Sequence, residues 1–138
     1  MLHYRFLYLL PLALVLFACD NKEIDIKYQV KRPTFKIDEE KYGDLINHNA
    51  ESPGDLIRKR AFDTYELEYF IAMEHKAIAQ SSSGAWGWSK DHDSPDEAMD
   101  RALELCRKTN HEPEKPCMIV NIDAFWAADF YREKKLRP

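Results

Sequence analysis

The fold is decided by residues 75–123, which read HKAIAQSSSGAWGWSKDHDSPDEAMDRALELCRKTNHEPEKPCMIVNID. Residues 75–80 are predicted to form a short strand, residues 81–84 (SSSG) a turn, and residues 85–89 a second extended segment. Ser and Gly favour turns, and a loop of three to five residues between two such runs is typical of a β-hairpin. The stretch therefore begins with two antiparallel strands.

The clearest helix signal follows at Ser94. The Ser94 side chain can accept a hydrogen bond from the Glu97 N–H, and the Glu97 side chain can reach back to the Ser94 N–H. Pro95 occupies the first helical position, where its missing N–H costs nothing. These residues predict a helix over 95–108.

The apolar face of this helix carries the small residues Ala98 and Ala102, which predict a close approach to a sheet. Residues 117–123 are rich in apolar and β-branched side chains, and this composition favours a central strand. Residues 123–131 continue either as a strand or as a short helix.

Residues 55–73 are predicted to form a second helix. Apolar or aromatic residues recur at every fourth position, from Ile57 to Met73, and charged residues occupy the other faces. Asp55 is the expected N-cap or first-turn acid. The fold class is therefore α+β, with a small antiparallel sheet (75–80, 85–89 and 117–123), the 95–108 helix on one face and the 55–73 helix packed beside it.

Residues 1–18 form a separate unit. Arg5 is followed by an uncharged run over 6–18 (FLYLLPLALVLFA) of 13 residues. A membrane-spanning helix needs about 20 apolar residues, so the run is short for a permanent span. Its length is that of the hydrophobic region of a signal peptide.

The end of this run, Leu16-Phe17-Ala18-Cys19, resembles the lipobox of bacterial lipoproteins. The resemblance implies a diacylglyceryl group on the Cys19 sulfur, cleavage after Ala18 and acylation of the new amine, for example with palmitate. Two or more acyl chains anchor a protein stably. By the same resemblance, Asp20 implies retention in the inner rather than the outer membrane, with the domain facing the periplasm. The alternative is an ordinary secretory signal that happens to end in Cys.

Residues 19–40 would then be the lipidated N-terminus with a tether or an edge strand. Ile24, Ile26, Tyr28 and Val30 alternate with polar residues, which favours a strand, while the charge density of the segment favours a tether. Residues 41–138 are expected to form one α+β domain, with loops and one helical turn near 42–46.

Three cysteines are present, and lipidation of Cys19 would leave Cys106 and Cys117 as an even pair. In an exported protein such a pair is expected to form a disulfide, because the compartment is oxidising. The competing interpretation, a catalytic thiol, needs a reduced cysteine and a nearby base.

Residues 75–123 also resemble the DUF4189-like family, a small domain of unknown function found in bacterial exported proteins. The resemblance implies a compact α+β unit with the two cysteines bonded, and it implies no known chemistry. This sequence differs in its longer loop between the cysteines and in its extension over 20–74. The resemblance is carried by Ala77-Ile78-Ala79, Gly84-Ala85-Trp86-Gly87-Trp88, Ser94, Glu97-Ala98, Ala102-Leu103, Cys106 and Cys117.

The composition is that of a single globular domain without a basic face. The chain has 138 residues, 32% of them charged, and a formal net charge of −4. A nucleic-acid binder usually carries a basic patch, so no nucleic acid is expected as a partner.

Trp86 and Trp88 are the candidate binding residues. They lie two positions apart, so in a strand both side chains point to the same face. Two indoles on one face can stack on a sugar ring or grip a partner protein. They can equally fill the core beneath the 95–108 helix.

No catalytic, cofactor or metal site is predicted. Residues 90–93 (KDHD) could hold a divalent cation, but a solvated loop before a helix is the expected interpretation. His75 could act as a base with Cys117 or Asp123, although a structural histidine is favoured. The remaining histidines form no ligand set.

The function expected from these features is that of a membrane-anchored periplasmic lipoprotein acting as a non-enzymatic binding or interaction module. Its partner would be an envelope protein or a cell-wall component. The alternatives are a small envelope hydrolase that uses His75 with Asp91 or His92, and a periplasmic inhibitor or immunity protein.

Overall fold

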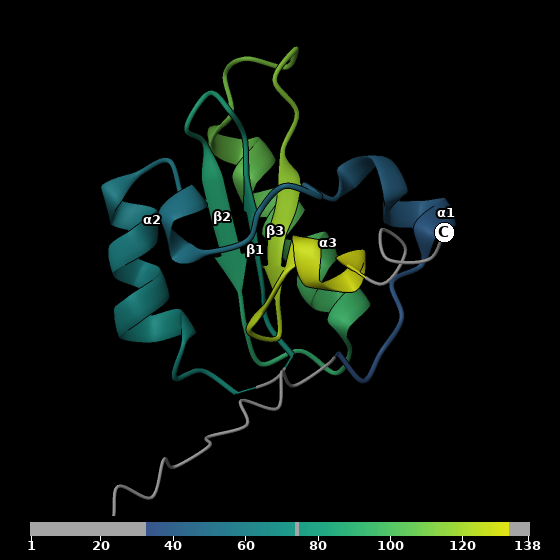
Figure 1. Ribbon diagram of the computed structural model, residues 1–138. Helices are drawn as coiled ribbons and strands as arrows, with labels where there is room; N and C mark the ends of the chain where they lie inside the picture. Colours follow the sequence, from purple (N-terminus) through teal and green to yellow (C-terminus); the bar gives the residue numbers. More distant parts are fainter. Residues whose placement is uncertain (1–32, 74, 133–138) are drawn as a thin grey trace, which may run out of the picture. The chain divides into compact units, whose positions relative to one another are not determined.

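A computed structural model describes residues 33–73 and 75–132. Four strands, β1 (Ala77–Gln80), β2 (Trp86–Ser89), β3 (Met118–Ile122) and β4 (Phe125–Trp126), form one antiparallel sheet. The strand order is β2-β1-β3-β4, so β2 and β4 are the edges (Figure 1). The predicted α+β class, the hairpin and the 117–123 strand are confirmed, and β4 is an additional short strand.

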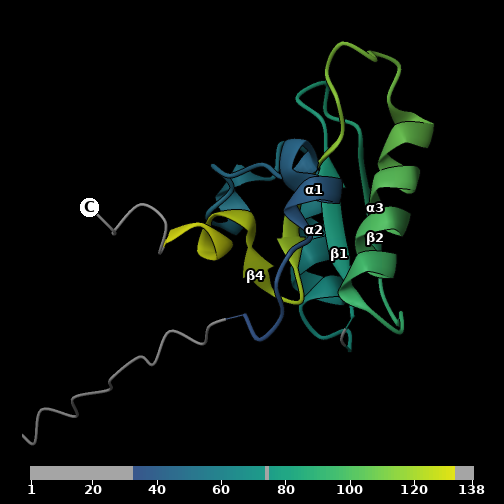
Figure 2. The same cartoon turned by 90° about the vertical axis from the view of Figure 1, so that its right-hand side faces the viewer.

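Helix α3 (Pro95–Thr109) covers one face of the sheet (Figure 2). Ser94 caps it as predicted, with the Glu97 N–H 3.2 Å from the Ser94 hydroxyl oxygen. The Glu97 carboxylate accepts from the N–H of Asp93, not from that of Ser94 as expected, so the reciprocal bond lies one residue earlier.

The predicted close approach of α3 to the sheet is confirmed. Ser89 donates a 2.6 Å hydrogen bond to the carbonyl oxygen of Ala98. A Cβ added at Gly87 would lie 2.7 Å from the carbonyl oxygen of Ala102. The helix therefore rests on the strand backbone, which small residues at these positions allow.

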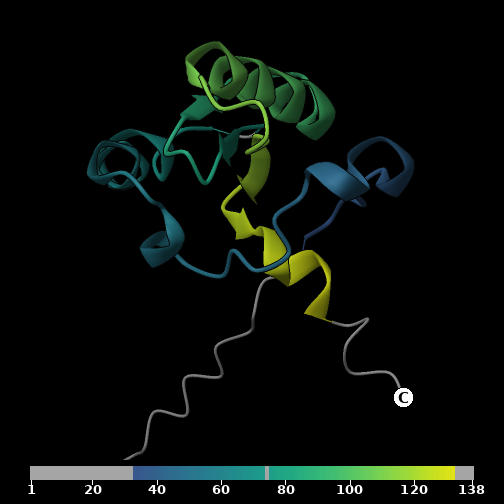
Figure 3. The same cartoon turned by 90° about the horizontal axis from the view of Figure 1, so that it is seen from above.

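The second helix is shorter than the predicted 55–73. Helix α2 spans Lys59–Thr64 and continues into a π-helical turn, η3 (Tyr65–Tyr69), closed by a bond from the Phe70 N–H to the Tyr65 carbonyl. Figure 3 shows α3 on one side of the sheet and α2 on the other. The prediction that the second helix packs beside α3 is therefore wrong.

The late start of α2 is explained by a local cap and by contacts with a distant side chain. Asp55 caps the preceding 3-10 turn η2 (Pro53–Asp55) and is not the N-cap of α2. The Gln80 side chain accepts from the N–H of Ile57 and donates to the carbonyl of Asp55, at 3.1 and 2.7 Å. The Asp55 carbonyl would accept the first bond of a helix that starts at Asp55, and here it is bound by Gln80 instead.

The end of this helix leaves apolar side chains in solvent. Lys76 donates to the carbonyls of Phe70 and Ala72, which terminates the helical segment at its negative end. Four large apolar residues at this end are more than 60% exposed: Leu67, Phe70, Ile71 and Met73. Met73, the last member of the predicted apolar repeat, therefore lies in solvent.

The N-terminal part of the domain adds helix α1 (Glu39–Tyr42) and the 3-10 turn η1 (Gly43–Leu45), close to the predicted helical turn. The buried Tyr42 hydroxyl donates to the Asp100 carboxylate at 2.8 Å. Burial raises the pKa of Tyr42 to about 12. Ile46 then pairs with Ile119 as an isolated parallel bridge.

Strands β3 and β4 are joined by a two-residue turn, Asp123-Ala124, in which both residues have positive φ (47° and 68°). Two positive φ angles are the mark of a type I′ hairpin turn. The 3-10 turn η4 (Ala127–Phe130) follows, so the open choice for 123–131 resolves into a short strand and then a short helix.

Candidate functional site

The main candidate site is a groove of about 650 Å³ between α2 and the edge strand β2. Trp86 and Trp88 line the β2 side of the groove, which is called its floor below. One wall is the stripe formed by Arg60 and Thr64 of α2 and Glu68 of η3, which follow one another at a spacing of four residues and all line the groove.

Both predicted binding residues therefore line one site. Trp86 and Trp88 point to the same face of β2, as expected from their spacing, and both are half-buried. They do not lie beneath α3, because they are on the opposite face of the sheet, but both pack against the hydrophobic core from that face. There the Trp88 ring meets the Tyr69 ring edge-on at 6.1 Å, and the ammonium of Lys90 lies 5.8 Å from the Trp88 ring centre.

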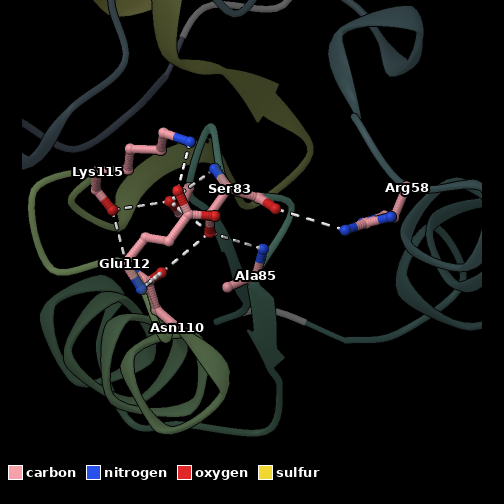
Figure 4. A network of polar contacts seen from close by, with 7 residues as sticks. Arg58, Ser83, Ala85, Asn110, Glu112 and Lys115 are labelled. Carbon is pink, nitrogen blue, oxygen red and sulfur yellow. Dashed lines mark hydrogen bonds and ion pairs between the residues drawn. The ribbon is translucent and has the colours of Figure 1, made fainter.

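A hydrogen-bond network holds one end of the groove in place (Figure 4). The Ser83 hydroxyl contacts the Asn110 side-chain oxygen at 2.9 Å and accepts from the Ala85 N–H at 3.2 Å. Asn110 in turn donates to the carbonyl of Lys115 at 2.7 Å. The hairpin loop that follows β1 is thus tied to the loop that follows α3.

The predicted disulfide anchors that second loop. Cys106, in α3, and Cys117, just before β3, are bonded, with their Cα atoms 6.1 Å apart. The bond closes the 107–116 loop, which contains Asn110, Lys115 and the groove residues His111 and Glu112. It therefore supports the groove as well as the fold.

The groove carries both signs of charge. Arg58 is used internally, since its guanidinium donates to the Ser83 and Gly84 carbonyls at 3.4 Å each. Glu112 forms an ion pair with Lys115. Arg60 and Glu68 form no ion pair with any other residue of 33–73 or 75–132 and are exposed. They are the charges available to a ligand.

Sequence reasoning found the aromatic floor of the groove but missed its polar wall. Arg60, Thr64 and Glu68 do follow one another at helical spacing. That spacing could have indicated a polar stripe, but only the tertiary arrangement turns the stripe toward β2.

His75 pairs with Asp123, one of the two partners considered for it. The His75 Nδ1 atom lies 2.6 Å from Asp123 Oδ2, and the Asp123 side chain is 3% exposed. The other carboxylate oxygen accepts from the Lys76 N–H at 2.8 Å. Cys117 is not a partner, because it is consumed by the disulfide.

The loop at 90–93 presents no metal site. Asp91 has a positive φ of 61°, and the main chain of His92 pairs with that of His75. Within the described ranges 33–73 and 75–132, no group of three or more His, Cys, Asp or Glu residues could hold a metal ion. The predicted lipidation site, Cys19, and the 24–30 alternation lie outside the described residues.

Comparison with known proteins provides no relative. No family model, no curated protein sequence and no solved structure matches this chain.

Proposed function

We propose that this chain is a membrane-anchored periplasmic lipoprotein that acts as a non-enzymatic binding module, and that its ligand site is the groove between α2 and β2. The observation that carries the proposal is the pair of half-buried indoles on the groove floor, flanked by the unpaired charges of Arg60 and Glu68. Half-buried aromatic residues beside charges are typical of binding hot spots.

The proposed location rests on two observations. The Cys106–Cys117 disulfide is characteristic of proteins that fold in an oxidising compartment. The signal-like segment and the lipobox-like residues at 16–19 supply a route for export and an anchor. Among the described residues, no helix has the length and apolar character to cross a membrane. The resemblance to the DUF4189-like family also remains a prediction.

The binding role is tested by capture from envelope extracts. Wild-type protein is expected to retain a specific protein or cell-wall fragment, and the Trp86→Ala variant is expected to lose it. Ile71→Ala is the matched control, because Ile71 is exposed but does not line the groove. Equal capture by the wild type and both variants would contradict the proposal.

The anchor is tested separately with labelled palmitate in cells. We expect the wild type to incorporate label, and the Cys19→Ser variant to remain unlabelled and to accumulate as unprocessed precursor. A wild-type protein without label, released into the periplasm, would show that Cys19 merely ends an ordinary signal peptide.

One observation favours the hydrolase alternative. In the His75–Asp123 pair, a buried carboxylate fixes the imidazole, as in a general-base pair. Asp123 is also a structural group here, since its N–H and carboxylate both bond to the main chain of Lys76. Hydrolysis of peptidoglycan fragments or peptide esters by the wild type, abolished in His75→Ala, would favour the enzyme. Copurification with a neighbouring toxin or hydrolase would instead favour the inhibitor alternative.

A further inference from the structure

Strand β2 presents main-chain hydrogen-bonding groups at the edge of the sheet. Antiparallel pairs alternate between hydrogen-bonded and non-hydrogen-bonded positions. The N–H of Ser81 donates to the carbonyl of Ala85 at 2.8 Å, so the next hydrogen-bonded pairs are Ala79 with Gly87 and Ala77 with Ser89. The N–H and C=O groups of Trp86 and Trp88 therefore point away from β1.

Within the described ranges 33–73 and 75–132, one of these outward groups has a partner. The Trp86 carbonyl accepts a long bond of 3.5 Å from the Thr109 hydroxyl. The Trp88 N–H and C=O bond to no other residue of 33–73 or 75–132. An exposed strand edge of this kind is a template for another extended chain.

The charges of the groove wall match an extended chain in spacing. Arg60 and Glu68 are eight residues apart, which is roughly 12 Å along a regular α-helix at 1.5 Å per residue and somewhat less here, because residues 65–69 form the π-helical turn. An extended peptide covers that distance in about four residues at 3.3 Å each. In an extended chain, residues four positions apart point to the same side. One side of the peptide could therefore present one residue to Arg60 and another to Glu68.

The direction of α2 relative to β2 fixes which charge lies at which end. Arg58, at the start of α2, contacts the hairpin loop that leads into Trp86. Tyr69, at the end of η3, contacts Trp88. Arg60 therefore lies toward the Trp86 end of the groove, and Glu68 lies toward the Trp88 end.

We infer that the groove binds an extended peptide that adds a strand to the outer edge of β2. The peptide would hydrogen-bond to the main chain of Trp88 and lay an apolar side chain on the two indoles. It would place an acidic side chain toward Arg60 and a basic one toward Glu68. The inference rests on the proposed binding function and names its ligand class, a peptide segment of an envelope protein.

The test is selection of a displayed library of random nonapeptides on the full-length, disulfide-bonded protein. We expect enrichment of sequences with an acidic and a basic residue four positions apart around an apolar residue. N-methylation of the peptide amide that faces Trp88 should weaken binding by about tenfold or more. N-methylation of the next amide, which points away from β2, is the matched control and should have little effect.

Charge reversal tests the orientation of the peptide without touching the aromatic floor. Arg60→Glu should change the preferred residue at the facing position from acidic to basic, and Glu68→Lys should do the reverse at the other end. Lys59→Glu is the control, because Lys59 pairs with Asp63 and does not line the groove. Both groove positions are exposed, so the variants are expected to fold.

Three results would overturn the inference, and the first of them would leave the proposed binding function intact. Trp86-dependent binding of chitotetraose or a muropeptide, without peptide enrichment, would leave the binding role intact and exclude a peptide ligand. Dimerisation that is lost in Glu68→Lys would assign the edge to a second copy of the chain. Enriched peptides that bind Arg60→Glu and Glu68→Lys unchanged would place the peptide site elsewhere.

Discussion

At the scale of single residues, Gly87 decides how closely α3 can approach the sheet. An added Cβ would lie 2.5 Å from the Cys106 amide nitrogen and 2.6 Å from the Leu105 Cβ. Both neighbours belong to the rigid helix, so neither can move aside alone. Gly87 is thus required by packing and not by its backbone conformation.

We therefore predict that Gly87→Ala lowers the free energy of unfolding by about 2–3 kcal/mol, in the upper part of the range of about 1–3 kcal/mol that is typical of overpacked cores. Gly43→Ala is the control: nothing lies within 4 Å of its added Cβ, and the backbone there is right-handed helical. That variant should be neutral or stabilised by up to about 1 kcal/mol. Urea unfolding of the oxidised proteins measures both, and equal stability of the two variants would contradict the packing account.

At the scale of elements, the β3–β4 hairpin is closed by an unfavourable residue. Ala124 has φ of 68°, a conformation in which a non-glycine residue costs about 1–2 kcal/mol. Glycine adopts this region freely but loses more entropy on folding, by about 0.4–1 kcal/mol.

Ala124→Gly should therefore raise the free energy of unfolding by about 0.5–1 kcal/mol, the difference between these effects. Ala128→Gly is the opposite case, because Ala128 lies in the right-handed turn η4. This variant should lower the free energy of unfolding by about 0.5–1 kcal/mol. Thermal or urea unfolding distinguishes the two, and a less stable Ala124→Gly protein would show that the turn is not strained.

At the scale of the whole molecule, the disulfide joins the fold to the groove. It closes a loop of sequence separation 11, and such a loop contributes roughly 3 kcal/mol in the chain-entropy model. The same loop holds Asn110, which bonds to Ser83 at the end of the groove. Loss of the disulfide should therefore lower the free energy of unfolding and also loosen the Asn110 end of the groove.

We predict that reduction of Cys106–Cys117 lowers the free energy of unfolding by roughly 3 kcal/mol. Urea unfolding with and without a reducing agent measures this change. The double variant Cys106→Ala/Cys117→Ala should have a lower free energy of unfolding than the oxidised wild type. The reductant should not change that value. If the wild type loses no stability on reduction, the loop is held by its hydrogen bonds and not by the disulfide.

The sequence by itself determined the elements whose signals are local. Four predictions of this kind are confirmed: the Ser94 cap, the small face of α3, the turn at 81–84 and the strand at 117–123. Each depends on neighbours within a few residues. The pairing of Cys106 with Cys117 was also predictable, because lipidation of Cys19 would leave only two cysteines to pair. The common face of Trp86 and Trp88 followed from the twofold period of a strand.

Tertiary structure decided everything that depends on contacts between distant segments. Gln80, far along the chain, binds the Asp55 carbonyl that a helix from Asp55 would use for its first bond, and α2 starts only at Lys59. Packing across the sheet fixes which sheet face α2 covers. It also fixes whether the indoles of Trp86 and Trp88 contact the core or the solvent. The stripe Arg60, Thr64 and Glu68 becomes a groove wall only because α2 lies beside β2. Periodicity gives the face of an element, but only its neighbours determine what that face meets.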